Sequence, residues 1–405
     1  MNKLIINAIG IVLLIPVSIY AQHNFNISEN SGLTIAVSNE IPKYEGDIVD
    51  YEKILTIEYD DTNINSYIDR PFPFHINAEG NYNVPDPFNK RIVIYDKEGK
   101  YIGEYGQSGE GPGEFQFIEL ITYDNQYAYY YDRNLGRTTI YNNNRDMIDI
   151  IRPLYGSPYG LEAIFPVIDD NTMIAFQRMR SLVDNNLIFS KMRAYIMNAD
   201  GDTLNIIETE ECPEQYRVPA SPGFSAMVKN IPIGARSLFA VNPDGMFVLG
   251  SGINNNYYVY RKNGVAVMNV KINIPTQTVT TEERNMIRDH MEEEVMRMPA
   301  PLRAQKRREN ESCIIPEIKG YWDSAVFDDN NYIWLRVPEL AEIRRTEGGA
   351  LYILIAPNGE FFGRTRWPVI DGRIQGNYLL GIERNNQTEE LNPVVYKIKW
   401  KFDNH

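Results

Sequence analysis

The sequence is poor in the side chains that build metal centres and hydrolytic triads. Its 405 residues include two cysteines, Cys212 and Cys313, and four histidines, which are His23, His75, His290 and His405. Three-histidine zinc coordination would need most of these histidines to converge. Neither a Ser-His-Asp nor a Cys-His nucleophile arrangement can be argued from so few. The cysteines form no CxxC motif and are too few for a disulfide scaffold, so whether they bond to each other stays open.

Positive charge is also scarce. The chain has 40 Lys and Arg against 54 Asp and Glu, which gives a net charge of −14. Binding to nucleic acid or anionic lipid needs concentrated positive charge, so we expect neither as a partner. The chain also lacks a Pro/Ser/Gly-rich linker or a low-complexity tract, and this absence favours a single domain.

A long apolar run occurs only at the N-terminus. Lys3 precedes an almost wholly apolar stretch, Leu4–Val17, and the small residue Ala21 follows shortly afterwards. This layout predicts a signal peptide over residues 1–21. An uncleaved membrane anchor is the alternative, but the run is shorter than the roughly 20 residues that cross a bilayer. Cleavage removes one Lys and leaves a net charge of about −15. No cysteine lies near the cleavage site, so we expect an exported protein, periplasmic or extracellular, that is neither lipid-anchored nor membrane-spanning.

Short runs rich in Ile, Val, Tyr and Phe alternate with Asp/Asn/Gly turns along the rest of the chain. One class of predicted hairpin covers His75–Val84, Thr122–Tyr131, Val167–Phe176, Ala240–Leu249 and Val326–Leu335. A hairpin of a second class follows each of these, over Arg91–Tyr105, Thr138–Ile151, Ala194–Ile207, Tyr257–Val270 and Tyr352–Thr365. Asn, Asp and Gly tolerate the backbone angles of tight turns. Each pair of hairpins therefore predicts a four-stranded antiparallel unit.

The first two units repeat a set of residues. Asp86, Arg91 and Tyr95 recur 46 positions later as Asp132, Arg137 and Tyr141. A period of this size with four strands is typical of a β-propeller blade. The Asp and Arg could bind a ligand, but we favour a structural role in which each Asp pairs with its Arg across the connecting turn.

A sixth unit stops early. It has two predicted strands, Tyr378–Arg384 and Val394–Trp400, whereas a further strand, Ile54–Tyr59, stands alone before the first unit. We predict an all-β fold, a six-bladed β-propeller of four-stranded antiparallel blades, in which this N-terminal strand completes the last blade and removes the open sheet edges. The propeller domain would cover residues 51–405, behind an N-terminal extension over residues 22–50.

One segment, residues 280–310, breaks the strand pattern. Thr280 and Glu283 form a capping box ahead of apolar residues at helical spacing, which are Ile287, Met291, Val295 and Met298. We predict a helical insertion here, divided into two helices by prolines. We interpret the basic run over residues 306–308 as a solvated face.

The segment Gly106–Phe115 reads GQSGEGPGEF and follows the last strand of the first unit. Together with the Val84–Asp86, Arg91–Ile94 and Asp96–Gly99 segments before it, it resembles NHL-repeat-like six-bladed propellers exported by bacteria. The likeness covers the first two units and weakens from the third, and the chain lacks the lipidation cysteine of many relatives. The structural signature comprises Asp86, Arg91, Gly106, Gly109, Gly111, Pro112, Gly113, Glu114, Phe115, Asp132 and Arg137.

The resemblance implies that this glycine-rich segment links the outer strand of one blade to the inner strand of the next, where tight turning requires glycine. A phosphate-binding loop is a poor alternative, because a strand follows instead of a helix and Glu114 has the wrong charge.

The resemblance also implies a site at the mouth of a central channel, but a fold alone does not decide between binding and catalysis. Lactonase-like propellers place carboxylates and Asn around a divalent cation, and the candidates here are Asp124, Asn125, Asp169, Asp170, Asp328 and Asp329. Turn chemistry alone explains those residues. Likewise, the tyrosines of Tyr127–Tyr131 could stack on a ligand, but their place in a strand favours the core.

We therefore favour a non-enzymatic binding or protein-interaction module that needs no cofactor and whose protein or small-molecule ligand is unidentified. The alternative is a lactonase-like hydrolase dependent on a divalent cation such as calcium.

Overall fold

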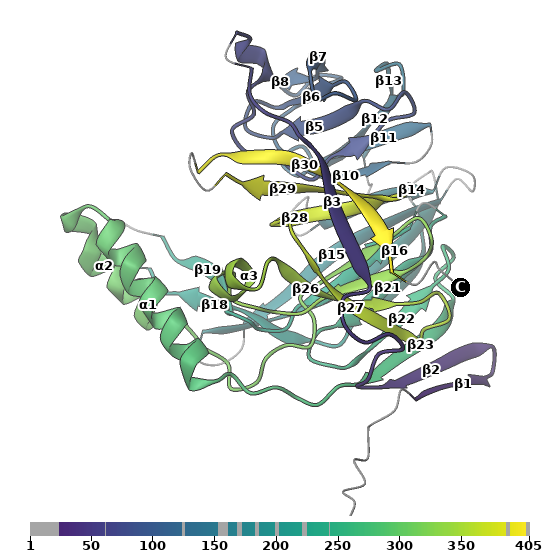
Figure 1. The fold of residues 1–405 in the computed structure, drawn as a ribbon, viewed down its shortest axis with the longest axis vertical. Coiled ribbons are helices and arrows are strands. Elements are labelled where there is room, and N and C mark those ends of the chain that lie inside the picture. Colours follow the sequence, from purple (N-terminus) through teal and green to yellow (C-terminus); the bar gives the residue numbers. More distant parts are fainter. Residues whose placement is uncertain are drawn as a thin grey trace, which may run out of the picture.

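The computed structural model describes residues 24–60, 62–123, 126–152, 161–167, 172–182, 186–198, 202–220, 225–242, 244–385 and 389–401. The predicted signal peptide lies outside these residues, as do His23 and His405. Strands dominate the described chain (Figure 1). A search of the described helices finds none that is both long and apolar enough to span a membrane.

The first half of the described chain forms three sheets in succession. Sheet 1 comprises β4 (His75–Ile76), β5 (Tyr82–Asp86), β6 (Arg91–Tyr95) and β7 (Tyr101–Tyr105). Sheet 2 comprises β10 (Ile118–Tyr123), β11 (Tyr127–Asp132), β12 (Arg137–Asn142) and β13 (Met147–Ile151). Sheet 3 comprises β14 (Leu161–Val167), β15 (Thr172–Leu182), β16 (Leu187–Asn198), β17 (Thr203–Glu208), β18 (Cys212–Val218) and β19 (Met227–Asn230). A short parallel pair, β8 (Gln107–Ser108) and β9 (Glu114–Phe115), lies between sheets 1 and 2.

Three further sheets follow in the second half. Sheet 4 is built on β20 (Ser237–Val241), β21 (Phe247–Ser251), β22 (Asn256–Tyr260) and β23 (Ala266–Asn273). Sheet 5 comprises β24 (Ser324–Phe327), β25 (Ile333–Arg336), β26 (Ala350–Ile355) and β27 (Phe361–Trp367). Sheet 6 comprises β28 (Asp371–Gln375), β29 (Tyr378–Arg384), β30 (Leu391–Trp400) and β3 (Val49–Thr56).

Antiparallel pairing confirms all ten hairpins predicted from the turn residues. Sheet 3 differs most from the prediction. Its β16 pairs with β17 through residues 193–197 and with β18 through residues 187–190, so successive parts of one long strand serve two partners. The sequence prediction missed β18 and β19.

The N-terminal strand β3 pairs with β30 in an antiparallel register that runs from Val49↔Trp400 to Thr56↔Val394 (Figure 1). The predicted bounds, Ile54–Tyr59, were wrong because the strand begins at Val49 and ends at Thr56. Its first half carries charged side chains that form ion pairs with β30 and its neighbours, such as Glu52 with Lys399. An apolar pattern cannot reveal such a strand, because its partner lies at the far end of the chain.

The predicted N-terminal extension also contains regular structure. β1 (Phe25–Asn30) and β2 (Leu33–Asn39) form a hairpin, and β2 pairs in parallel with β23 at the edge of sheet 4. The predicted boundary at position 50 falls inside β3.

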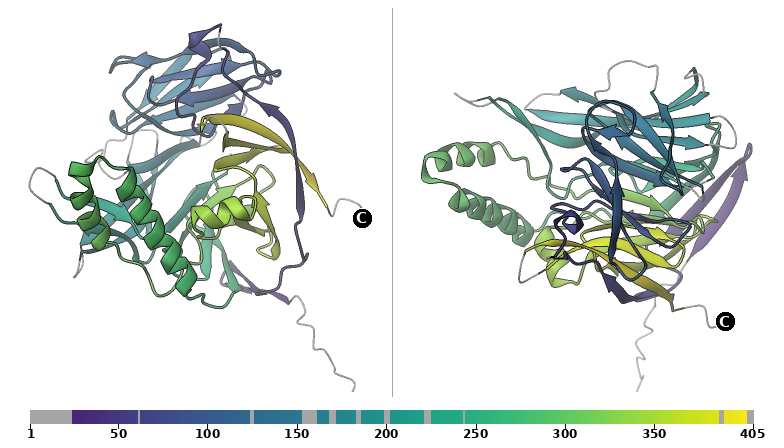
Figure 2. Two further views of the ribbon diagram at one scale, coloured as in Figure 1. Left: turned by 60° about the vertical axis from the view of Figure 1, so that its left-hand side comes forward. Right: turned by 90° about the horizontal axis from the view of Figure 1, so that it is seen from above.

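The helical insertion contains α1 (Thr281–Arg297) and α2 (Ala300–Glu311), and both views of Figure 2 show the pair at the edge of the molecule. The capping box of Thr280 and Glu283 is confirmed. The basic run is more than a solvated face, because Lys306 and Arg307 form ion pairs with glutamates of α1. A third helix, α3 (Ala341–Thr346), joins β25 to β26.

Buried apolar clusters lie between consecutive sheets. Sheets 1 and 2 share one cluster, sheets 2 and 3 a second, sheets 3 and 4 a third, sheets 4 and 5 a fourth, and sheets 5 and 6 a fifth. A sixth cluster joins sheet 6 to sheet 1, through contacts such as those of Leu380 and Val395 with Val84. The tyrosines Tyr129, Tyr130 and Tyr131 are buried, which confirms their predicted place in the core.

Candidate functional site

A cavity of about 550 Å³ lies where the first strands of the sheets meet. Residues of β10, β14, β20, β24 and β28 line it, and sheet 1 contributes the segment over residues 71–73 just before β4. Most of the lining is apolar and includes Phe165, Phe239 and Phe327. Concave sites with mainly apolar walls and a few polar groups are typical of ligand-binding cavities.

Six charged residues also line this cavity, and they are Glu119, Arg178, Arg236, Asp323, Asp371 and Arg373. The sequence prediction singled out none of them. Arg236 and Asp323 directly precede β20 and β24, and Asp371 is the first residue of β28. A charged residue at the same position of three successive units was the signal that could have identified them.

Two of the charged groups belong to buried ion pairs. Arg178 donates to Glu214, whose side chain is only 3% exposed and also accepts from the Ser237 N–H at 2.5 Å. Asp323 accepts from Arg336 Nε at 2.6 Å. Arg344 also lies 3.6 Å from Asp323, so both groups have at least one partner of opposite charge.

The Arg236 guanidinium has a different environment. Its side chain makes no ion pair or hydrogen bond with any residue in the described ranges, and burial lowers its pKa below the usual value. Burial disfavours the charged form of a cation when the surroundings supply too little compensation. The nearby carboxylate of Asp323 acts against this effect without contacting Arg236. Arg236 thus presents to the cavity a guanidinium whose hydrogen-bond donors have no direct protein partner within the described ranges.

Asp371 and Arg373 project to the same side of β28, because alternate residues of a strand share a face. The Arg373 guanidinium lies over the Tyr123 ring, 4.2 Å from its centroid, and donates to the Ile121 carbonyl at 3.3 Å. Asp371 is open to the solvent space of the cavity, yet surrounding protein raises the pKa of its carboxyl against the opposing effect of Arg336.

The predicted signature residues lie elsewhere, and none of them is among the residues that line the cavity. In sheet 1, Arg91 Nε donates to Asp86 at 3.2 Å, as expected for the pair. In sheet 2, Asp132 and Arg137 face each other in the ladder, but the predicted side-chain pair is wrong. Arg137 donates instead to the carbonyls of Glu110, Gly111 and Glu114.

The glycine-rich segment Gly106–Phe115 is a folded connection held by Arg137, whose three bonds to its carbonyls measure 2.6–2.8 Å. The Glu114 carboxylate accepts from the Gly111 N–H at 2.7 Å, which closes the turn around Pro112 and Gly113. At Gly106, φ is +81° and an added Cβ would lie 2.7 Å from the buried Phe115 ring, so this position requires glycine. These residues therefore shape the connection between sheets 1 and 2.

Of the six candidates for a cation site, Asp124, Asn125, Asp169 and Asp170 lie outside the described residues. The buried Asp328 carboxylate is engaged in its own turn, where it accepts from the N–H groups of Asn330 and Tyr332 and from Trp334 Nε1, each at 2.9 Å. Asp329 accepts from the Gly376 N–H at 2.6 Å. Within the described ranges, no three or more His, Cys, Asp or Glu side chains are grouped so that they could hold a metal ion.

The described histidines and cysteines offer little reactivity. His75 stacks on Tyr123 with 5.2 Å between ring centroids, and burial together with Arg373 lowers its pKa to about 3. Both thiols are free in the structure. Burial raises the pKa of Cys212 to about 12, with a further contribution from Glu214, so its thiol stays protonated at neutral pH.

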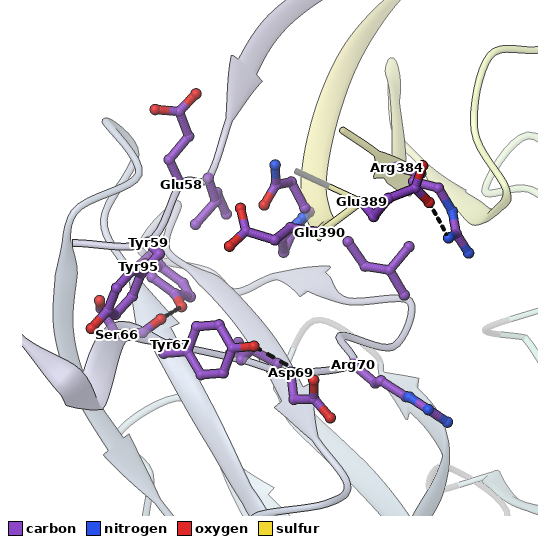
Figure 3. Close-up of a pocket in the computed structure, with 15 residues that line it drawn as sticks. Glu58, Tyr59, Ser66, Tyr67, Asp69, Arg70, Tyr95, Arg384, Glu389 and Glu390 are labelled. Carbon is purple, nitrogen blue, oxygen red and sulfur yellow. Dashed lines mark hydrogen bonds and ion pairs between the residues drawn. The ribbon is translucent and has the colours of Figure 1, made fainter. Parts of the chain in front are cut away.

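A second cavity, of about 310 Å³, lies beside the segment that follows β3 (Figure 3). Two of its polar side chains bond to neighbouring residues of the protein. Tyr95 donates to the Ser66 carbonyl at 2.6 Å, and Arg384 donates to Glu389 at 2.7 Å. The first cavity, called the central cavity below, is the stronger candidate for a binding site because it is larger and its lining is mainly apolar.

No protein-family model matches this chain, and no curated protein matches it in sequence. Solved structures similar to it include a candidate exported protein from Bacteroides fragilis NCTC 9343, with 11% identity over 91% of this chain and 99% of the other and a TM-score of 0.49. A member of the DUF4221 family from Bacteroides vulgatus ATCC 8482 has 15% identity over 87% and 99%, with a TM-score of 0.48. A gluconolactonase from Xanthomonas campestris has 8% identity over 82% and 88%, with a TM-score of 0.37.

Proposed function

We propose that this chain is an exported binding protein built on a six-bladed β-propeller, with its ligand site in the central cavity. The observation that carries the proposal is one mainly apolar cavity, lined by strands of five sheets and by residues 71–73 before β4, with the unpaired guanidinium of Arg236 in its wall. A binding site needs shape and a few oriented polar groups, and the cavity offers both.

Two observations support a closed ring of six blades. The apolar cluster between sheets 6 and 1 joins the last sheet to the first, as five other clusters join the sheets between them. The pairing of β3 with β30 supplies the fourth strand that the C-terminal segment lacks. Closure of this kind leaves no long sheet edge within the ring open to other chains.

The ring is tested by truncation. Deletion through Tyr59 removes β3 together with the buried side chains of Ile48, Val49 and Ile57. We expect the melting temperature of the mature chain to fall by roughly 10 °C or more. Deletion through Asn30 removes only β1, which pairs with β2 alone, and should lower it far less. Equal melting temperatures for the long truncation and the full mature chain would contradict closure by β3.

Binding in the cavity is tested by filling it. Ser324 lines the cavity and its hydroxyl makes no hydrogen bond with a described residue, so Ser324→Trp adds bulk without removing a polar contact of that part of the chain. In a thermal-shift screen of organic acids, sugars and short peptides, ligands should stabilise the wild type and an exposed control, Ser28→Trp, but not Ser324→Trp. Equal stabilisation of both variants would place the binding site elsewhere. Elemental analysis of the same samples addresses the rival function, since one tightly held calcium or zinc ion per chain would support a cation-dependent hydrolase.

A further inference from the structure

Three arginines and three acidic residues line the central cavity, but they differ in whether the protein already pairs them. Three of the six charged lining residues are neutralised by ion pairs, namely Arg178 by Glu214, Asp323 by Arg336 and Glu119 by Arg133. The other three, Arg236, Arg373 and Asp371, form no ion pair with any residue that the structure describes. Two guanidinium groups therefore face one carboxyl group, which leaves an excess of one positive charge.

This local excess contrasts with the net charge of the whole chain, which is −14. A cleft with low-dielectric walls concentrates the field of the charges that line it, so a local positive excess attracts anions even when the outer surface repels them. The two cations are also unequal. Arg373 is already engaged by the Tyr123 ring and the Ile121 carbonyl, whereas Arg236 has no such partner.

We propose that the cavity binds a small organic acid with a single carboxylate, which pairs with Arg236, and an apolar body, which contacts the aromatic wall. This inference rests on the proposed function and names its ligand class. A guanidinium forms two parallel hydrogen bonds with one carboxylate, a geometry that gives both strength and orientation. A ligand with two negative charges fits less well, because Asp371, which has no ion-pair partner among the described residues, lies in the same cavity wall and repels a second negative charge.

The rest of the lining indicates what the acid carries. Phe165, Phe239 and Phe327 come from sheets 3, 4 and 5, and all three line the cavity. Aromatic side chains contribute large apolar contact areas and favour ring-bearing ligands through stacked or edge-to-face contacts. An aryl-substituted carboxylic acid therefore satisfies both the charged and the apolar parts of the site.

The experiment compares 3-phenylpropionate with its neutral isostere, 3-phenylpropionamide, and with inorganic phosphate, by calorimetric titration of the mature protein at low ionic strength. We expect the carboxylate to bind at least tenfold more tightly than the amide, and phosphate to bind more weakly than the carboxylate. Equal affinities for carboxylate and amide, no binding of the carboxylate, or preferential binding of phosphate would each overturn the proposal.

Two variants locate the interaction. Arg236→Gln should weaken carboxylate binding at least tenfold and leave amide binding unchanged, whereas the exposed Arg297→Gln should change neither. Arg236→Lys keeps the charge but loses the planar guanidinium, so its affinity for the carboxylate should lie between those of the wild type and Arg236→Gln. This variant also tests the inference if Arg236→Gln does not fold. Unchanged carboxylate binding in both Arg236 variants overturns the inference. If both probes bind equally and Ser324→Trp abolishes both, the inference fails while the proposed binding function stands.

Discussion

Sheets 1 and 2 contain an Asp and an Arg at equivalent positions, but the side chains of the two pairs have different hydrogen-bond partners. Asp86 and Arg91 occupy the same ladder positions in sheet 1 as Asp132 and Arg137 in sheet 2, directly opposite each other across one turn. In sheet 1 the two side chains bond to each other. In sheet 2 they bond to the connection that enters the sheet. A repeated sequence thus determines the register of the strands but not the partner of each side chain.

In both sheets, the Arg and the Tyr of the repeat donate hydrogen bonds to the chain segment that precedes the sheet. Arg91 Nη2 donates to the Tyr67 carbonyl at 2.7 Å, and Tyr95 donates to Ser66. One period later, Arg137 donates to three carbonyls and Tyr141 donates to Gly113 at 3.2 Å. The Arg and Tyr of the repeat therefore attach a blade to the segment that precedes it.

The aspartates adapt to the local turn. Asp132 accepts backbone N–H groups from both sides, those of Gln116 and Phe117 before the sheet and of Asn134 and Leu135 in the turn. Asp86 accepts from Asn89 as well as from Arg91. With four donors on Asp132, its carboxylate is satisfied without the arginine, and this frees Arg137 to hold the glycine-rich connection.

The largest effect is expected from Arg137→Ala. Arg137 is 1% exposed, and its guanidinium donates to three carbonyls. Of these, the Gly111 carbonyl keeps a second donor, the Glu114 N–H. We expect the free energy of unfolding to fall by about 3 kcal/mol in urea denaturation, since each unsatisfied buried group is costly. The control Arg133→Ala removes a largely exposed arginine paired with Glu119 and should cost at most about 1 kcal/mol. Equal losses would show that Arg137 does not anchor the connection.

Arg91→Ala should lower the free energy of unfolding by less, about 2 kcal/mol. Arg91 donates to one carbonyl only, and Asn89 continues to donate to the buried Asp86 in the variant. The same denaturation series measures it. A loss greater than that of Arg137→Ala would reverse the comparison, and would mean that the exposed Glu104 partner of Arg91 matters more than its contact with Tyr67.

The sequence was sufficient to predict the structural elements that depend on neighbouring residues in the chain. Asn, Asp and Gly turns located the ten hairpins, and the capping box located α1, because these signals depend on neighbours in the chain. The beginning of β3 and the hairpin of β1 and β2 were missed because their partners, β30 and β23, lie hundreds of residues away. The cavity was missed for the same reason. Nothing near Arg236 in the sequence marks it, because the strands that line the cavity with it come from five separate sheets.

Double-mutant cycles test the different pairings directly. Asp86→Asn combined with Arg91→Gln should show a coupling energy of about 1 kcal/mol, because the two side chains are in contact. Asp132→Asn combined with Arg137→Gln should show clearly less, because each side chain bonds to backbone groups of its own. Similar coupling in the two sheets would mean that the charges of Asp132 and Arg137 interact despite their separate partners.

The smallest losses of unfolding free energy are expected from Phe substitutions of Tyr95 and Tyr141. They test whether the hydrogen bonds of these two tyrosines to the preceding segments are equivalent. The Tyr95 hydroxyl makes a buried bond of 2.6 Å, whereas that of Tyr141 is longer, at 3.2 Å, and only partly buried. Tyr95→Phe should therefore cost about 1 kcal/mol and Tyr141→Phe about half of that. Tyr67→Phe is a matched control, because its hydroxyl makes only a weak, exposed contact of 3.5 Å with Asp69, and it should leave the denaturation midpoint unchanged. If Tyr141→Phe costs more than Tyr95→Phe, hydrogen-bond length and burial do not rank these anchors. The glycine-rich connection would then depend on Tyr141 as much as on Arg137.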